Sequence, residues 1–136
     1  MAKTVELVAP TIQVKQILDH VDQLRKSVAK EKLRQDLKAF AENLRDLARL
    51  NEFGGDQDGD QVHARCVELC RLSRRILFGI WPEEDGCELA EAVIKMFFAA
   101  AEQIPDSTDE FPLLSDYRDN IVLRARDLQP FVCAAT

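Results

Sequence analysis

Glycine and proline are absent from residues 11–53, a stretch of 43 residues that Pro10 precedes and Gly54-Gly55 follows. The stretch is rich in Leu, Lys, Glu, Gln, Ala and Arg, the residue types that lose least free energy on entering a helix. The rest of the chain repeats this composition between short turns that contain glycine or proline. The sequence therefore predicts an all-α fold.

Long apolar runs and a secretory signal are also missing. No apolar run approaches the ~20 residues that a membrane-spanning helix needs. The first eight residues carry Lys3 and Glu6 among apolar neighbours, which is not the pattern of a signal peptide. The four cysteines, Cys66, Cys70, Cys87 and Cys133, lack the spacing of a zinc ribbon or a redox CxxC motif. We therefore expect a cytoplasmic protein with reduced thiols and no membrane association.

A net positive charge is lacking as well. The chain has 18 Lys and Arg against 24 Asp and Glu, so its formal charge is −6. Binding to a phosphate backbone needs a cationic face, so the charge argues against nucleic acid as the main partner. It is compatible with a protein partner that has a basic surface. At 136 residues and 46% apolar content, residues 1–136 are expected to form a single domain without metal or disulfides.

Two apolar stripes with helical spacing lie within residues 11–53. Their members are Val14, Ile17, Val21, Leu24 and Val28 in the first, and Leu33, Leu37, Phe40, Leu44 and Leu47 in the second. The step of five from Val28 to Leu33 would turn the second stripe by about 140° on one straight helix. The chain either turns near Ala29–Lys32 to form a helical hairpin or continues as one long helix. The change of face favours the turn, although the lack of glycine and proline favours the long helix.

With this turn, the pattern predicts helices over 11–28, 32–53, 60–80, 86–104 and 113–128. Similar lengths are typical of an up-and-down helical bundle of four to five helices. The segment 86–104 is apolar over most of its circumference, which predicts a central position. Asp58 or Asp60 is expected to cap the helix over 60–80, and Ser115 or Asp116 the helix over 113–128.

Two groups of residues have metal-ligand chemistry, and neither predicts a cofactor. The loop from Asp56 to Asp60 has the acidic residues of a calcium loop, but its glycine is at position four instead of six. His63, Cys66 and Cys70 could face a soft metal from one helix. Cys66, however, lies within the apolar stripe, where small buried thiols are common. We expect a solvated acidic turn and buried thiols.

Motifs for catalysis are also absent. Neither histidine has a Ser or Cys neighbour in a recognisable nucleophile motif. The carboxylates are placed in turns and on polar faces, whereas general acid–base catalysis needs them in a desolvated cleft. The acids that follow Ser107 form a short pattern that an acidophilic kinase could read, but such patterns often arise by chance. We expect the protein not to be an enzyme.

Three arginines and two aromatic residues form the best candidate site. Arg71, Arg74 and Arg75 are opposite the buried stripe of the helix over 60–80. Phe78 shares their outer face, and Trp81 follows at the end of the helix. Arginine with aromatic residues is the composition enriched at the centres of protein interfaces. Alternatively, a neighbouring helix covers Phe78 and the arginines pair with the chain's own acidic turns.

These observations favour a non-enzymatic protein-interaction module, in the form of a small acidic inhibitor or adaptor of a larger protein. The predicted partner-binding residues are Arg71, Arg74, Arg75, Phe78 and Trp81. One alternative is a self-associating subunit that forms a homodimer through the N-terminal helices, because the stripes of residues 11–53 could pair between chains. The other alternative is a helical-bundle enzyme or metal-binding protein.

Overall fold

The computed structural model describes residues 10–52, 59–80 and 87–132, and over these ranges the chain forms five α-helices and no strand. The helices are α1 (Pro10–Arg25), α2 (Glu31–Glu52), α3 (Gly59–Ile80), α4 (Cys87–Gln103) and α5 (Leu114–Leu128), followed by a 3₁₀ turn, η1 (Gln129–Phe131). The predicted all-α fold is confirmed. For α3, α4 and α5, each boundary is within one residue of the one predicted.

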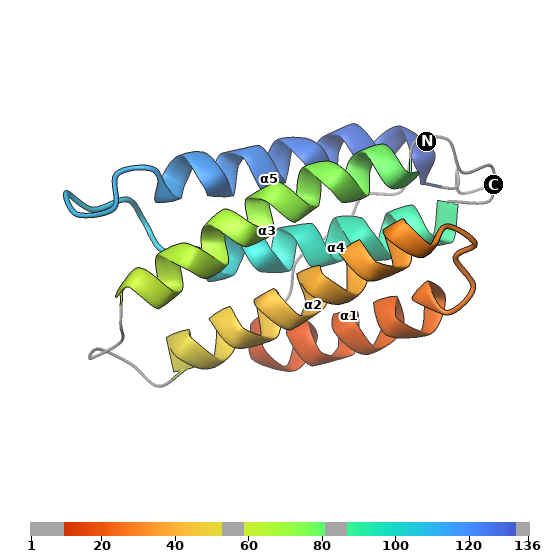
Figure 1. Cartoon of the computed structure of the whole chain (residues 1–136), viewed down its shortest axis with the longest axis horizontal. Coiled ribbons are helices and arrows are strands. Elements are labelled where there is room, and N and C mark those ends of the chain that lie inside the picture. Colours follow the sequence, from red (N-terminus) through yellow and green to blue (C-terminus); the bar gives the residue numbers. More distant parts are fainter. Residues whose placement is uncertain (1–9, 53–58, 81–86, 133–136) are drawn as a thin grey trace.

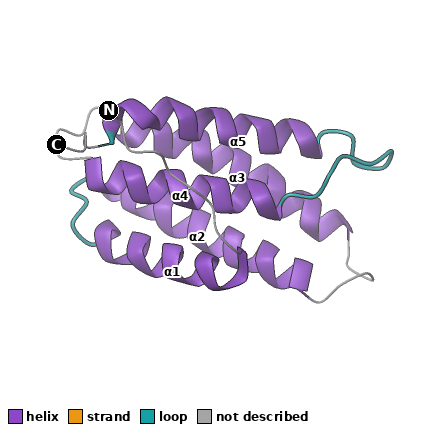
Figure 2. Cartoon of the chain, turned by 180° about the vertical axis from the view of Figure 1, so that it is seen from behind, coloured by secondary structure: helices purple, strands orange, loops and turns teal. Residues whose placement is uncertain are grey.

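The helices lie along one long axis, and each reverses the direction of the helix before it (Figure 1). This is the predicted up-and-down bundle. The order around the bundle differs from the order in the sequence, because α4 returns to lie between α1 and α5 (Figure 2). As a result α3 and α5 are neighbours that run in parallel, and contacts such as Cys70 with Arg124 join residues 54 positions apart.

The α1–α2 turn resolves the two arrangements that the sequence left open. Helix α1 ends at Arg25 and α2 begins at Glu31, so residues 11–52 form a hairpin instead of one long helix. The first helix ends three residues before the predicted boundary. Val28, now in the turn, remains buried, and Arg34 Nη1 donates a hydrogen bond of 2.7 Å to its carbonyl oxygen. This turn lets both apolar stripes face the same core.

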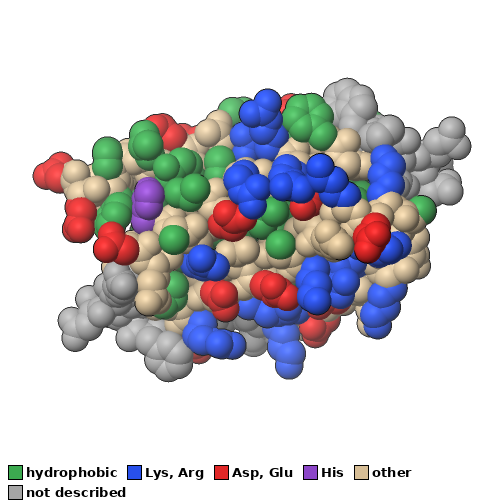
Figure 3. Space-filling view, in the orientation of Figure 1, with side chains coloured by type: hydrophobic (Ala, Val, Ile, Leu, Met, Phe, Trp, Pro, Cys, Tyr) green, Lys and Arg blue, Asp and Glu red, His purple; other side chains and the backbone are tan. Residues whose placement is uncertain are grey.

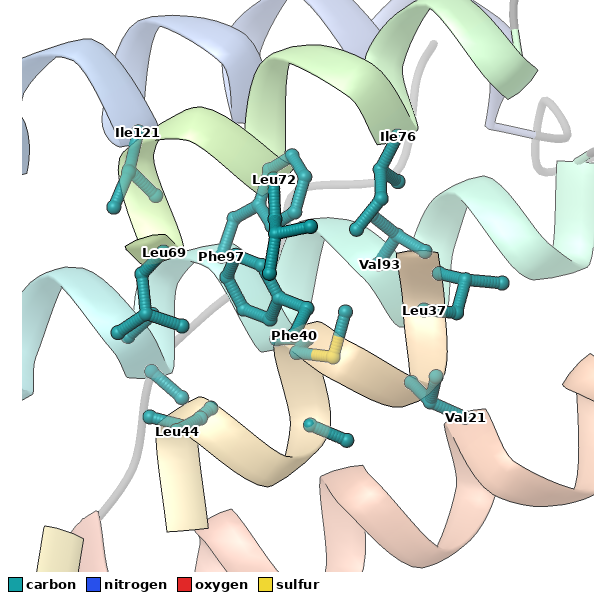
Figure 4. Close-up of a cluster of buried hydrophobic side chains, with 14 of the residues drawn as sticks. Val21, Leu37, Phe40, Leu44, Leu69, Leu72, Ile76, Val93, Phe97 and Ile121 are labelled. Carbon is teal, nitrogen blue, oxygen red and sulfur yellow. The ribbon is translucent and has the colours of Figure 1, made fainter. Parts of the chain in front are cut away.

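Buried apolar side chains from all five helices form one core cluster. Figure 4 shows part of it, where Val93 and Phe97 of α4 lie among side chains of the other helices. Helix α4 contacts each of the other four helices. Its fully buried residues are Ala90, Val93, Ile94, Met96, Phe97 and Ala100. The rings of Phe97 and of Phe40 from α2 have centroids 5.1 Å apart and are tilted by 41°. The predicted central position of this helix is confirmed.

The start of α5 differs from the sequence prediction. Leu113 occupies the N-cap position and makes no capping hydrogen bond with its side chain. Ser115 lies in the first turn and exchanges two hydrogen bonds with Ser107, in which each backbone N–H donates to the hydroxyl of the other residue, at 3.2 and 2.8 Å. The predicted caps Ser115 and Asp116 are therefore wrong, because a serine from the preceding loop supplies the acceptor. For α3, Asp60 lies in the first turn and Asp58 outside the described residues.

The C-terminal segment packs back onto the bundle as far as it is described. The turn η1 contacts α4 and α5. Phe131 is half-buried against the core and Val132 is buried. Residues 133–136, which include Cys133, lie outside the described part of the chain.

Candidate protein-binding surface

The outer face of α3 carries an exposed stripe with steps of three and four residues. Its members are Gln61, Ala64, Glu68, Arg71, Arg74 and Phe78, of which only Glu68 is half-buried. Within the described ranges the exposed large apolar side chains are Phe78, Leu123 and Leu113, at 61%, 53% and 49%. Phe78 is thus the most exposed of them. None of the five described helices covers it, so the alternative of a core Phe78 is wrong.

The guanidinium group of Arg74 lies over one face of the Phe78 ring. Its guanidinium carbon lies 5.8 Å from the ring centroid, one helical turn away. At this distance the cation is attracted to the negative face of the ring. Arg74 therefore keeps a positive charge beside an exposed aromatic ring, which is the composition expected of a binding anchor.

Arg71 is paired within its own helix. Its guanidinium makes an ion pair with the Glu68 carboxylate one turn earlier. The hydrogen bond from Arg71 lowers the pKa of the Glu68 carboxyl, and the same bond raises the pKa of Arg71. The middle of the exposed stripe is therefore locally neutral, with an acid and a base that both reach solvent.

Arg75 has a different environment from the other two arginines. Its Nε lies 3.3 Å from Oδ2 of Asp36 in α2, and Asp36 is buried to 7% exposure. This pair joins α2 to α3, so Arg75 pairs with an acid of its own chain, although that acid lies in a helix and not in one of the acidic turns. Trp81 lies outside the described residues. Of the five predicted site residues, the structure thus places Arg71, Arg74 and Phe78 together on the exposed face.

A hollow of about 310 Å³ lies beside Phe78, between the start of α2 and the end of α3. Lys30 and Lys32 line its rim, and Lys30 Nζ donates a hydrogen bond of 3.2 Å to the Gly79 carbonyl oxygen. Gly79 itself packs against Leu33, where an added Cβ would lie 2.9 Å from Leu33 Cδ1. The glycine thus allows the close approach of α2 and α3 that fixes this cationic end.

A second hollow, of about 590 Å³, lies at the other end of the same two helices. It is lined by Asp46, Arg49, Leu50, Asp60, Gln61, Ala64 and Arg65. Leu50 and Ala64 are apolar, while Asp46 and Asp60 lie at its edges together with Arg49 and Arg65. Arg65 is held away from the exposed stripe, because its Nη1 lies 2.7 Å from Asn43 Oδ1 and 4.0 Å from Asp46 Oδ2.

The face formed by α2, α3 and α5 is therefore unevenly charged. Figure 3 shows most Lys and Arg side chains over the middle and over the half that contains the end of α3, with some acidic side chains among them, and further acidic side chains at the opposite edge. The net charge of −6 conceals this separation. A docking surface on this face would have a cationic end beside Phe78 and, around the second hollow, an end with Asp46 and Asp60 beside Arg49 and Arg65.

The candidate soft-metal ligands point in different directions. His63 turns toward the loop before α5, where its ring stacks on Phe111 with centroids 5.0 Å apart. Cys66 is fully buried, and burial raises the pKa of its thiol to about 12. Cys70 is half-buried and its Sγ lies 3.4 Å from Arg124 Nη1. Over the described ranges no three His, Cys, Asp or Glu side chains lie close enough to hold a metal ion. The acidic loop 56–60 lies largely outside those ranges.

His20 lies away from this surface, on α1. Its Nε2 is 3.8 Å from Oε1 of Glu88 in α4, and both side chains are largely exposed, at 49% and 72%. General acid–base catalysis needs its groups in a desolvated cleft, and both of these side chains are largely exposed. Ser107 belongs to the short pattern that an acidophilic kinase could read. In the structure its hydroxyl accepts a hydrogen bond from the backbone N–H of Ser115.

Two polar contacts between helices were not predicted from the sequence. Arg124 of α5 reaches across to α3, where its Nη1 lies 2.9 Å from Oγ of the fully buried Ser73. Asp36 meets Arg75 as described above. Asp36 and Ser73 each interrupt an apolar stripe, which is a signal that a polar partner must be near. The identity of the partner depends on how the helices pack, and no spacing in the sequence shows that.

In comparisons with known proteins, no family model, no curated protein and no solved structure matches the chain. A search of the described helices for one that is long and apolar enough to cross a membrane also found none. The site is therefore interpreted from its own residues.

Proposed function

We propose that this protein is a non-enzymatic protein-interaction module that binds its partner through Arg71, Arg74 and Phe78 on the outer face of α3. The observation that carries the proposal is the 61% exposure of Phe78 at the end of a stripe that also carries the exposed Arg71 and Arg74. An exposed aromatic ring loses the favourable free energy of burial unless another surface covers it. Aromatic residues and arginine supply most of the energetically dominant contacts in protein interfaces.

The geometry makes this anchor ready for binding. An aromatic side chain buries 150–250 Å² in full, so covering the exposed part of Phe78 would contribute on the order of 2–3 kcal/mol. Arg74 already lies over the ring, and Lys30 and Leu33 hold the end of α3 against α2. A partner would therefore order few groups on binding, which reduces the entropic cost.

The local charge indicates the chemistry of the partner. Arg74, Lys30 and Lys32 lie close to Phe78, so the complementary surface is an apolar pocket with acidic edges. The net charge alone suggested a basic partner. At physiological salt, charges further away than about 8 Å are largely screened, so the residues beside the anchor dominate the contact. An inhibitor or an adaptor would both use such a surface.

Self-association is the second candidate function, and the charge separation along α3 favours it. Pairing through residues 11–53 is not favoured, because both apolar stripes face the chain's own core. The residues concerned, all buried or packed against that core, are Val14, Ile17, Val21, Leu24, Val28, Leu33, Leu37, Phe40, Leu44 and Leu47. A second copy would have to use another face.

A photoreactive amino acid at position 78 tests the proposed function. Cells of the source organism that express this variant should yield a cross-linked product under light. The same probe at Gln23, an exposed residue of α1, is the control and should give none. The partner protein captured in this product is identified and purified on its own. Its affinity for the wild-type chain is then measured by calorimetry.

Matched variants separate binding from folding. Phe78→Ala should weaken binding by about tenfold or more and leave the melting temperature nearly unchanged. Leu123→Ala removes a similarly exposed apolar side chain from α5 and should change neither quantity. If Phe78→Ala lowers the melting temperature while the affinity is unchanged, Phe78 is a structural residue and the proposal fails.

A further inference from the structure

We infer that the partner of this surface is a second copy of the same chain, docked antiparallel along α3. Phe78 of each copy would enter the hollow of about 590 Å³ near the start of α3 in the other copy. This inference rests on the proposed function, since it names the partner of the same residues. Three features of α3 support it, namely an anchor, a socket and a balanced ion pair between them.

The anchor and the socket lie on one stripe of one helix. Phe78 is at the end of α3, and the hollow of about 590 Å³ opens beside Gln61 and Ala64 near its start. The two are separated by about 15 residues, or roughly 22 Å along the helix. Because both belong to the same exposed face, a two-fold axis across the middle of α3 would exchange them between two copies.

The chemistry of the two ends is complementary. Phe78 is apolar and has Arg74 over its ring, while the socket has apolar Leu50 and Ala64, with Asp46 and Asp60 at its edges beside Arg49 and Arg65. The ring would cover apolar surface, and Arg74 would come within reach of an acidic edge. A symmetric dimer makes this contact twice, since the same patch serves both copies.

The charged residues at the centre of the face are also complementary between two copies. A two-fold axis near residues 69 and 70 places Glu68 of one copy opposite Arg71 of the other, and the reverse. Both reach solvent and form an ion pair within the single chain. They can exchange that partner for the equivalent residue of the second copy, so no like charges meet at the axis. Ala64 is small, which allows the two α3 helices to approach closely.

The size of the face sets the expected strength. Helix α3 has 22 residues, about 33 Å, and with α2 beside it offers a strip roughly 20 Å wide. The strip covers about 660 Å² a side, near the lower end of specific interfaces, which typically bury about 800 Å² a side. We therefore expect a reversible dimer that dissociates in the micromolar range and weakens with added salt, because charged contacts contribute.

The decisive experiment exchanges the charges at the axis and measures dimer formation by sedimentation velocity. Glu68→Arg and Arg71→Glu should each weaken the homodimer at least tenfold, because like charges then meet across the axis. An equimolar mixture of the two variants should form a heterodimer as strong as the wild type. Mixing cannot restore the pair within one chain, so only a contact between copies explains recovery. Glu91→Lys mixed with Lys95→Glu, a pair within α4 at 3.7 Å, is the control and should show no preference for the heterodimer.

Two further variants test the anchor and the socket. Phe78→Ala should weaken the dimer about tenfold, and Ala64→Arg, which fills the socket from an exposed position, should do the same. Leu123→Ala should have no effect. Circular dichroism confirms that each variant is folded.

The outcomes separate this inference from the proposed function. A wild-type chain that stays monomeric at high micromolar concentration, while the position-78 probe captures a different protein, overturns the dimer and leaves the proposed function intact. A dimer that ignores Phe78→Ala and the charge exchange uses another face, which also overturns the inference. A monomer whose position-78 probe captures nothing overturns both.

Discussion

Neighbouring arginines on one helix have different roles because of where each side chain ends. Arg74 and Arg75 are adjacent in the sequence and point about 100° apart on the helix. Arg75 reaches the carboxylate of Asp36 in α2, whereas Arg74 lies over Phe78 in solvent. Residue type alone does not show which arginine pairs within the chain and which stays exposed. That distinction depends on the position of α2.

This difference predicts unequal effects on stability. Arg75→Ala leaves the carboxylate of Asp36, whose side chain is 10% exposed, without its partner. Because Arg75 is itself partly exposed, we expect a loss of about 1–3 kcal/mol. Arg74→Ala should stay within about 0.5 kcal/mol of the wild type, as surface changes usually do. Urea unfolding measures both, and equal effects would show that the Asp36–Arg75 pair does not stabilise the fold.

The buried thiol of Cys66 predicts a loss of stability at alkaline pH. Burial raises its pKa from 9.0 to about 12, so the folded state keeps the thiol protonated where the unfolded state ionises it. The stability from this difference is complete below pH 9 and is lost as the pH rises from 9 toward 12. The loss approaches about 1.4 kcal/mol per pH unit within that window.

Comparison with Cys66→Ala isolates this residue. Other groups titrate in the same range, so the measured quantity is the difference in unfolding free energy between the two proteins. Below pH 9 the difference should be constant, and above it the wild type should lose stability faster. A difference that stays constant up to about pH 11 would mean that the thiol ionises equally easily in both states.

At the scale of helices, apolar periodicity predicted the elements well and their ends less well. The change of face between Val28 and Leu33 indicated a turn, and burial of both residues in one core explains why it had to form. The end at Arg25 was missed because Val28 continues the stripe while its backbone has already left the helix. A buried side chain does not require a helical backbone.

The start of α5 shows a second limit of local patterns. Ser115 has the chemistry of a capping residue, but its backbone N–H is itself the donor, and the acceptor comes from Ser107 in the preceding loop. Capping rules assume that the acceptor lies next to the first turn. The 105–113 loop folds back and supplies it from eight residues away.

These reciprocal hydrogen bonds predict a coupled effect of the two serines. Ser107→Ala removes the acceptor for the Ser115 N–H and should destabilise the protein by about 1 kcal/mol. Ser115→Ala should cost a similar amount, since it removes the acceptor for the Ser107 N–H. A double-mutant cycle in urea should show that the two losses are not additive. Strict additivity would indicate that the two bonds act independently. Ser27→Ala, at an exposed serine of the α1–α2 turn, is the control and should change little.

At the scale of the molecule, the position of α4 determines which face of α3 remains open. Because α4 packs between α1 and α5, it fills the centre and leaves the outer side of α2 and α3 uncovered. The sequence predicted that α4 is central from its narrow polar strip. It could not predict the order around the bundle, because several helices have apolar stripes of similar width. The hollows beside Phe78 and Ala64 depend on that order and were not predicted.

The central position of α4 predicts the largest effect of a single substitution. Phe97 is fully buried and its ring packs against Phe40, so Phe97→Ala removes apolar contacts and leaves a cavity that rigid helices cannot fill. We expect the free energy of unfolding to fall by about 3–5 kcal/mol in urea. The adjacent Phe98 is only half-buried, so Phe98→Ala is a matched control that should cost clearly less. If Phe97→Ala costs under about 1 kcal/mol, the core does not depend on α4, and the arrangement that exposes the α3 face loses its physical basis.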